Sequence, residues 1–338
     1  MVRLGIVVPC YNEQEVLGET ARRLDELLTR LTAAGLVCPD SAVYFIDDGS
    51  RDATWSIIQG LSANRRFRGI KLSRNRGHQN ALLAGLMTAK GDAVVSVDAD
   101  LQDDLNVIEA MIRCFVEGAD IVYGVRSDRT TDSWFKRFTA ESYYRVLSVL
   151  GVEVVFNHAD YRLMSRRALL ALSEYREVNL FLRGIIPQLG FTTATVEYTR
   201  SERFAGESKY PLKRMIALAV DGVTSFTAAP LRAITALGMV VCVGSFAMVV
   251  WALLVRLFLE SALPGWASTV VPIYFLGGVQ LLCIGIIGEY LAKIYIEVKA
   301  RPKFIVDARA GSESPQLGFE ISDQTSEYKV PVTPRRDA

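Results

Sequence analysis

Cysteine and histidine are scarce in this sequence, and their scarcity excludes several kinds of site. The five cysteines are an odd number, stand far apart and form no Cys-x-x-Cys pair, so we expect neither a disulfide framework nor a cysteine zinc site. The two histidines, His78 and His158, are too few for a multi-histidine metal centre. A charge excess is also missing, since the chain has 38 Lys and Arg residues and 37 Asp and Glu residues. This balance argues against nucleic acid as a partner, because proteins that bind it usually carry a basic excess.

Several short motifs of nucleotide and ester chemistry are missing too. The chain has no Gly-x-Gly-x-x-Gly, no Gly-x-x-x-x-Gly-Lys-Ser/Thr and no Gly-x-Ser-x-Gly. Dinucleotide dehydrogenase, P-loop NTPase and α/β-hydrolase assignments therefore lose their main support. The N-terminus lacks a basic segment followed by a long apolar core and a cleavage site, so we expect no signal peptide.

Apolar residues, by contrast, are abundant, at 50% of the chain against 22% charged residues. They concentrate in two charge-free runs, Ala233–Val255 and Ser261–Gly288. A helix needs about 20 apolar residues to cross a bilayer, so the runs predict a transmembrane hairpin, with a pair of buried core helices as the alternative. Basic residues flank the hairpin on both sides and are sparse in the loop between the runs, so both termini are expected in the cytoplasm.

Short apolar runs alternate with helix-like segments over the first part of the chain. We expect strands at residues 2–9, 42–46, 69–72, 93–97 and 120–123, and helices at 15–31, 54–63, 79–89 and 105–116. This alternation is typical of an α/β fold, a mostly parallel sheet with helices on both faces. Ligands of such sheets bind beyond the carboxyl ends of the strands, and polar clusters follow three of the expected strands.

The first polar cluster is Val8-Pro9-Cys10-Tyr11-Asn12-Glu13. Pro9 is expected to end its strand. Tyr11 offers a flat face for a base, and Glu13 offers acceptor oxygens for a ribose hydroxyl. An ordinary loop with a helix cap at Asn12 is the competing interpretation.

The second cluster, Asp47-Asp48-Gly49-Ser50-Arg51-Asp52, follows the strand at 42–46. A carboxylate at a strand end can accept a hydrogen bond from a base imide or a ribose hydroxyl, and Asp48 is the candidate. Asp52 is expected to cap the next helix instead. The basic residues of Ser73–Asn80 suit a phosphate or sugar beside a helix N-terminus, with a solvated loop and an asparagine cap as the equal alternative.

The third cluster, Asp98-Ala99-Asp100-Leu101-Gln102-Asp103-Asp104, holds four carboxylates in seven residues. They would repel one another without a cation. Aspartates two apart at a strand end can share a hard divalent ion, and Mg²⁺ or Mn²⁺ takes oxygen ligands from carboxylates and substrate phosphates. Such an ion stabilises a diphosphate leaving group. We therefore expect Asp98 and Asp100 to bind it, while Asp103 or Asp104 caps a helix.

Taken in order, these clusters resemble those of family 2 inverting glycosyltransferases of the GT-A fold. The resemblance rests on VVPCYNE, DDGSRDAT, SRNRGHQNALLAGL, DADLQDD, DYRLMSR and RFAGESK, and it covers about residues 1–305. More narrowly, the chain is similar to polyprenyl-phosphate glycosyltransferases, the dolichyl-phosphate mannose synthase type and its bacterial bactoprenyl-phosphate glucosyltransferase relatives. The Gln-x-x-Arg-Trp motif of processive synthases is absent, which favours transfer of a single sugar.

The resemblance implies roles for residues in each motif. Those implied for the nucleotide sugar are Pro9, Tyr11, Asn12, Glu13, Asp48, Asp98, Ala99 and Gln102. Those implied for Mg²⁺ or Mn²⁺ are Asp98, Asp100 and Gln102. Those implied for the acceptor phosphate are Arg126, Arg137, Arg203 and Lys209, with Arg129 as a further candidate. The implied catalytic set is Asp160, which would lie near the reacting carbon, together with Asp100, Arg126, Arg137 and Arg203.

By the same resemblance, one hexose passes with inversion from a nucleotide-diphosphate sugar to polyprenyl phosphate. Glucose from UDP-glucose onto undecaprenyl phosphate is the first expectation. Mannose from GDP-mannose, another sugar or another membrane acceptor are alternatives, as is a non-enzymatic transport or nucleotide-sugar-binding component. The acceptor phosphate is largely dianionic near neutral pH, with a second pKa of about 6, so no strong general base is needed. We expect a homo-oligomer in the bacterial inner membrane.

Five regions are expected along the chain. A cytoplasmic GT-A catalytic domain covers residues 1–208, juxtamembrane amphipathic helices 209–231, two transmembrane helices 232–292 and a cytoplasmic extension 293–306. Residues 307–338 are polar and rich in serine and proline, which predicts a disordered tail. The segments Trp134–Leu150 and Tyr210–Arg232 mix apolar and basic residues, so each is expected at the membrane surface, with core packing as the alternative.

Overall fold

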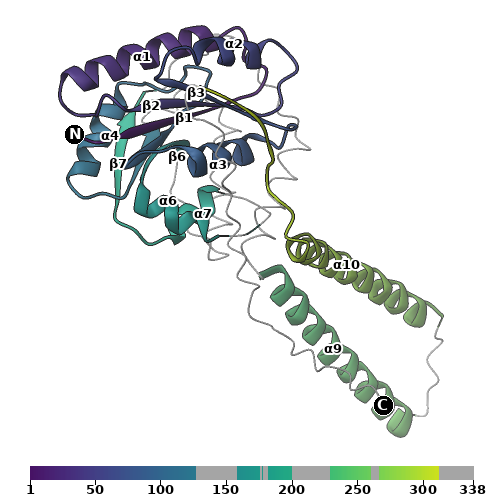
Figure 1. Ribbon diagram of the computed structural model, residues 1–338. Helices are drawn as coiled ribbons and strands as arrows, with labels where there is room; N and C mark the ends of the chain where they lie inside the picture. Colours follow the sequence, from purple (N-terminus) through teal and green to yellow (C-terminus); the bar gives the residue numbers. More distant parts are fainter. Residues whose placement is uncertain (127–157, 176, 178–181, 200–228, 260–265, 312–338) are drawn as a thin grey trace, which may run out of the picture.

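The computed structural model describes residues 1–126, 158–175, 177, 182–199, 229–259 and 266–311. The α/β part is built on an eight-stranded sheet with the order β7-β5-β6-β4-β1-β2-β3-β8 (Figure 1). Its strands are β1 Leu4–Cys10, β2 Ala42–Asp47, β3 Phe67–Leu72, β4 Ala93–Ser96, β5 Ile121–Arg126, β6 His158–Ser165, β7 Thr193–Tyr198 and β8 Val306–Ala310. Most neighbours pair in parallel, but β6 is antiparallel to β4 and β5, and β8 is antiparallel to β3.

Helices cover both faces of this sheet, and each face has its own apolar core. The first core lies beneath α1 (Leu17–Ala33), α2 (Thr54–Leu61) and α4 (Val107–Val116). The second lies beneath α3 (His78–Thr88), α6 (Arg166–Ser173) and α7 (Leu182–Gln188). The predicted α/β class, a mostly parallel sheet between two helical layers, is therefore confirmed.

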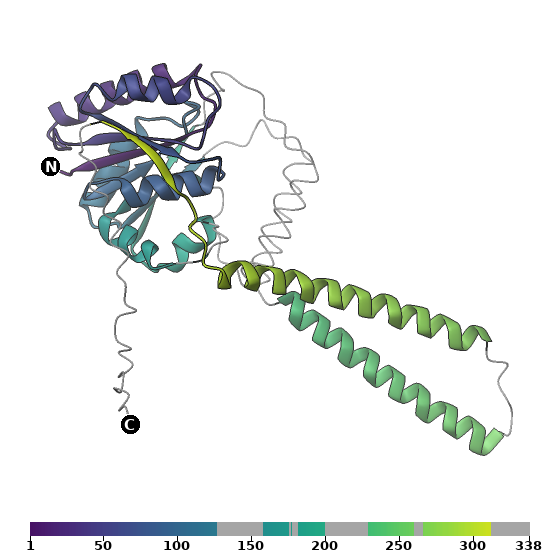
Figure 2. The ribbon, with the colours of Figure 1, turned by 45° about the vertical axis from the view of Figure 1, so that its right-hand side comes forward.

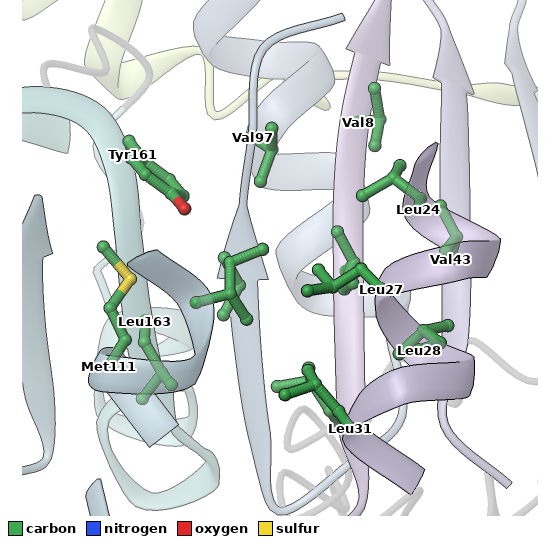
Figure 3. Close-up of a cluster of buried hydrophobic side chains, with 14 of the residues drawn as sticks. Val8, Leu24, Leu27, Leu28, Leu31, Val43, Val97, Met111, Tyr161 and Leu163 are labelled. Atoms are coloured by element: carbon green, nitrogen blue, oxygen red, sulfur yellow. The ribbon is translucent and has the colours of Figure 1, made fainter. Parts of the chain in front are cut away.

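Helix α1 shows how the sequence produces this packing. Its leucines recur at intervals of three and four residues, so they form one apolar stripe, which points at the sheet in Figure 3. Leu24 and Leu28 lie in the same core as Val8 and Val43 of the strands beneath. Strand β1 is buried along its whole length because helices cover both of its sides. That is why it reads as an unbroken apolar run.

Helix α3 lies close to the sheet because a glycine faces it. A Cβ atom at Gly85 would lie 2.2 Å from Val7 Cγ1 and 2.9 Å from Ile46 Cγ1. We expect Gly85→Ala to destabilise the protein by about 1–3 kcal/mol through overpacking, measured by chemical denaturation. Gly18→Ala in α1 is the matched control, since nothing lies within 4 Å of the added atom. It should be neutral or stabilising by up to about 1 kcal/mol, and equal losses in both variants would contradict the packing argument.

Strand β1 differs from the sequence-based expectation at its end. It continues through Pro9, which pairs with Ile46 of β2, so the prediction that Pro9 ends the strand is wrong. The missing N–H of Pro9 faces the same side of β1 as the carbonyl of Val7, which accepts from Val97. Because β4 ends at Ser96, no β4 residue pairs with β1 at the level of Pro9, so its missing N–H removes no hydrogen bond between the two strands.

The C-terminal region differs as well. The sequence predicts disorder from residue 307, but Val306–Ala310 form β8 along the edge strand β3. Its side chains alternate between half-buried and exposed, and backbone pairing rather than an apolar run makes it a strand. The prediction is therefore wrong for residues 307–310. Residues 312–338 lie outside the described part of the chain, and there it stays a prediction.

Two long helices, α9 (Ala229–Leu259) and α10 (Trp266–Val298), lie side by side and project away from the α/β part (Figures 1 and 2). They expose large apolar side chains, including Phe246 at 70% and Leu281 at 73% exposure, and apolar surface on this scale marks an interaction site. Within the described ranges, one segment is long and apolar enough to cross a membrane, Leu276–Val298, with a mean hydropathy of 1.6.

Candidate active site

One edge of the sheet gathers the polar clusters. The carboxyl ends of β1, β2 and β4 meet there because these strands are parallel. Strand β6 runs in the opposite direction, so its first residues come to the same edge. Ser96, the last residue of β4, is in register with Arg162, and its hydroxyl donates to the carbonyl of Asp160. The topology thus brings Asp160 to the loop that follows β4.

The loops after β1 and β2 are joined by hydrogen bonds. Asn12 has a positive φ of 56°. Its N–H donates to Ser50 Oγ at 2.9 Å, and its Oδ1 accepts from the N–H of Arg51 at 2.9 Å. Asn12 therefore does not cap α1, whose capping position is Val16. The adjoining Tyr11 is 40% exposed, as a residue that stacks on a base would need to be.

Asp48 anchors the loop that leads into α3. Its two carboxylate oxygens accept from the N–H groups of Arg76 at 2.7 Å and Gly77 at 2.9 Å. Burial raises the pKa of Asp48, although these two bonds oppose the shift. Gly49, with φ of +69°, allows the loop to come this close, because a Cβ atom there would lie 2.6 Å from the backbone of Arg74. The predicted contact of Asp48 with a nucleoside stays a prediction.

Asp52 lies one residue before the capping position of α2, which is Ala53, and its carboxylate binds backbone N–H groups of two loops. Its Oδ1 accepts from the N–H of Thr54, the first residue of α2, at 3.0 Å, and its Oδ2 accepts from the N–H of Gln14 at 3.3 Å. The N–H of Glu13 in turn donates to Thr54 Oγ1 at 2.9 Å. These bonds hold the β1 and β2 loops as one surface beside the strand ends.

Asp98 lies in a concentration of negative charge. Its pKa is raised to about 6, chiefly by burial and also by the carboxylates of Asp103, Asp160 and Asp100, against the opposing effect of His78. Leu101 turns the chain with φ of +57°. One oxygen of Asp100 accepts from the N–H of Gln102 at 3.2 Å, which fixes the loop after β4.

The residues after β4 fit a divalent cation that is completed by substrate. Asp98 and Asp100 supply hard oxygen donors, and the crowding of carboxylates around Asp98 is the electrostatic setting that a cation relieves. In the described part of the chain, no three His, Cys, Asp or Glu side chains form a preassembled metal site. Two carboxylates with the remaining positions left to phosphate oxygens and water are typical of Mg²⁺. Gln102 is mostly buried, and its place as a ligand stays a prediction.

Asp160 is the most strongly held carboxylate of the site. Arg162 Nη2 lies 2.5 Å from its Oδ1, and Arg183 donates to both oxygens at 3.2 and 3.0 Å. His78 Nε2 lies 3.5 Å from Asp160 Oδ2 and 3.7 Å from Asp98 Oδ1. Burial by itself raises the pKa of Asp160, but His78 and the two arginines outweigh it and hold that pKa well below its usual value. Asp160 is therefore ionised and a poor proton acceptor.

Arg126, at the end of β5, belongs to a second polar network. Its Nε donates to the Tyr198 hydroxyl at 3.3 Å, and that hydroxyl donates to Asp103 Oδ1 at 2.6 Å. Asp103 is thus not a helix cap. Asp104 does accept from the N–H of Asn106, at 2.9 Å, just before α4. Arg126 lies near the loop after β4, and its contact with acceptor phosphate stays a prediction.

Several predicted site residues lie outside the described ranges: Arg129, Arg137, Arg203 and Lys209, together with the segment Trp134–Leu150 and most of Tyr210–Arg232. Sequence reasoning also missed residues that the structure places at the site. His78 lies in the motif SRNRGHQNALLAGL and Arg162 in DYRLMSR, but the motifs alone do not indicate their contacts with Asp160. Arg183 has a weaker signal, a single charge among apolar residues, and only its contact with Asp160 distinguishes it.

Comparison with known proteins gives the family of the chain. The model of the family described as glycosyl transferase family 2 matches residues 5–172. An uncharacterized glycosyltransferase, YkoT, from Bacillus subtilis (strain 168) is 50% identical over 307 residues, which are 90% of this chain and 91% of that protein. The chain belongs to glycosyl transferase family 2. It is therefore a glycosyltransferase, and the predicted family and enzyme class are confirmed.

This family 2 glycosyltransferase has further relatives. The SfII prophage-derived bactoprenol glucosyl transferase of Shigella flexneri is 41% identical over 310 residues, covering 90% of this chain and 97% of that protein. Among solved structures, the mannosyl-3-phosphoglycerate synthase from Rubrobacter xylanophilus is 16% identical with a TM-score of 0.48, over 68% of this chain and 74% of that one.

Proposed function

We propose that the enzyme transfers one glucose from UDP-glucose, with inversion, to undecaprenyl phosphate at the cytoplasmic face of a bacterial membrane. The observation that carries the proposal is the joining of two parts in one chain. A carboxylate loop and an arginine-held aspartate share one sheet edge, and an apolar helical hairpin follows the same domain. The name of the Shigella flexneri relative, a bactoprenol glucosyl transferase, supports the lipid acceptor and the sugar.

The donor would lie across the loops after β1, β2 and β4. Tyr11 would stack on the base, and Glu13 would accept from the ribose. Asp98 and Asp100 would hold Mg²⁺ or Mn²⁺, which neutralises negative charge on a departing diphosphate. Catalysis would then come mainly from positioning the two substrates and from stabilising charge.

Asp160 is suited to orient groups rather than to remove a proton. Its oxygens accept bonds from Arg162 and Arg183, and these keep it ionised. The reaction does not need a base, because a phosphate monoester with a second pKa of about 6 is already a nucleophile at neutral pH. Its oxygen would attack the sugar carbon from the face opposite the diphosphate. The negative charge near that carbon would favour the cationic character of the transition state.

The deciding experiment incubates the purified full chain with undecaprenyl phosphate and a panel of radiolabelled sugar nucleotides. We expect lipid-extractable label from UDP-glucose, loss of the signal with EDTA and its return with Mg²⁺ or Mn²⁺. Label from GDP-mannose or UDP-GlcNAc instead would correct the donor. No lipid-linked label from any donor would overturn the proposal. The anomeric configuration of the product, read by NMR, tests inversion.

A further inference from the structure

One carboxylate at the site edge binds two guanidinium groups that differ in accessibility. Arg162 and Arg183 both contact Asp160, at 2.5 Å and 3.0 Å for their closest approaches. The Arg162 side chain is fully buried, whereas the Arg183 side chain is 38% exposed. Of the two, Arg183 is therefore the one that a ligand can reach.

The buried partner is sufficient to balance the carboxylate. Arg162 is fixed at the centre of the sheet, in register with Ser96 and Tyr123, so its charge stays beside Asp160. Arg183 therefore adds a second positive charge beside a carboxylate that Arg162 already balances. The two bonds from Arg183 to Asp160 instead fix the plane of its guanidinium. A guanidinium fixed in this way is prepared to bind a phosphate group through paired N–H donors.

Arg183 is also close to the carboxylate loop. The N–H of Leu182 donates to Gln79 Oε1 at 3.0 Å, which ties the start of α7 to the start of α3. The neighbouring His78 lies between Asp160 and Asp98, at 3.5 and 3.7 Å from their carboxylates. The guanidinium therefore lies on the same edge as the predicted diphosphate position.

Helix α7, which begins at Leu182 and carries Arg183, lies on the side of the α/β part nearest the helical hairpin. Helices α6 and α7 lie at the end of the α/β part that faces α9 and α10 in both views (Figures 1 and 2). Just after α10, Lys303 Nζ donates to the carbonyl of Tyr175 at 2.9 Å, close to the end of α6. A phosphate carried by a membrane lipid would approach the site from this side.

We propose that Arg183 binds a substrate phosphate, and that Asp160 and Arg162 hold its guanidinium in position. The inference rests on the proposed function and deepens it. The phosphate is that of the lipid acceptor or the diphosphate of the donor, and the position of α7 favours the acceptor. Asp160 then acts as a positioning residue for Arg183.

The test compares wild type, Arg183→Ala and Arg183→Lys as full chains in detergent. We expect Arg183→Ala to raise the KM for undecaprenyl phosphate about 10- to 100-fold and to leave the KM for UDP-glucose within about twofold. Arg183→Lys should recover part of the loss, because lysine keeps the positive charge but lacks the paired N–H donors of the guanidinium. Arg113→Ala, which removes an arginine paired with Glu109 on α4, is the control and should match wild type.

The outcomes separate the two phosphate sources and the two proposals. A raised KM for UDP-glucose in place of the lipid would assign Arg183 to the diphosphate. Unchanged KM values for both substrates in a variant with wild-type Tm would overturn the inference. Binding of undecaprenyl phosphate measured without donor gives the same comparison without turnover. Failure of wild type to form product would instead refute the proposed function.

Discussion

Replacing Asp100 with alanine is expected to lower the rate of sugar transfer by about 10²- to 10³-fold. The variant loses one of the two carboxylates that fit a divalent ion beside the diphosphate. Asp100 is half-buried in the loop after β4, where one oxygen accepts from the N–H of Gln102 at 3.2 Å. That bond is local, so the fold should survive the change and the loss should fall on activity. Transfer of label to lipid extract gives the rate.

Asp104→Ala is the matched control for this variant. Asp104 is half-buried in the same loop, but its carboxylate accepts from the backbone and side chain of Asn106. We expect it to lose stability modestly and to keep most of its activity. Mn²⁺ binding in the presence of UDP, followed by electron paramagnetic resonance, should weaken in Asp100→Ala alone. Equal effects of the two variants on Mn²⁺ binding and on rate would show that Asp100 has no special place at the metal.

The parts of this fold that follow from the sequence are those whose cause is local. An unbroken apolar run such as β1 indicates a strand buried on both sides, and the leucine spacing of α1 indicates one buried helix face. The two aspartates of the β4 loop are candidates for the same reason. Their spacing and their place after a strand are visible along the chain itself.

The parts that do not follow depend on contacts between distant residues. Arg183 meets Asp160 only because β6 runs against β4 and α7 folds back beside α3. Asp48 appears in the sequence as a carboxylate available to a nucleoside, yet its oxygens hold the loop at Arg76 and Gly77. No spacing in the chain carries this information, since the partners are set by sheet topology.

Strand β8 is the clearest case of such a contact, and its removal should have a large effect. Deleting residues 306–338 is expected to destabilise the α/β part by about 2–4 kcal/mol. The deletion removes the pairing with Gly69–Leu72, at about 1 kcal/mol for each hydrogen bond, and the packing of Val306 against the second core. At about 2–4 °C per kcal/mol for a domain of this size, Tm should fall by roughly 4–16 °C.

Deleting residues 312–338 is the matched control, because it removes most of the same segment and leaves β8 in place. Thermal unfolding in detergent compares the full-length chain with the two shortened chains. We expect the shorter deletion to keep the wild-type Tm and the longer one to lower it and to promote association through the uncovered edge of β3. The same Tm for both deletions would show that β8 contributes nothing to stability. A loss that follows β8 alone would instead mean that the segment after the hairpin belongs to the catalytic sheet, so that the hairpin is joined to the domain at both of its ends.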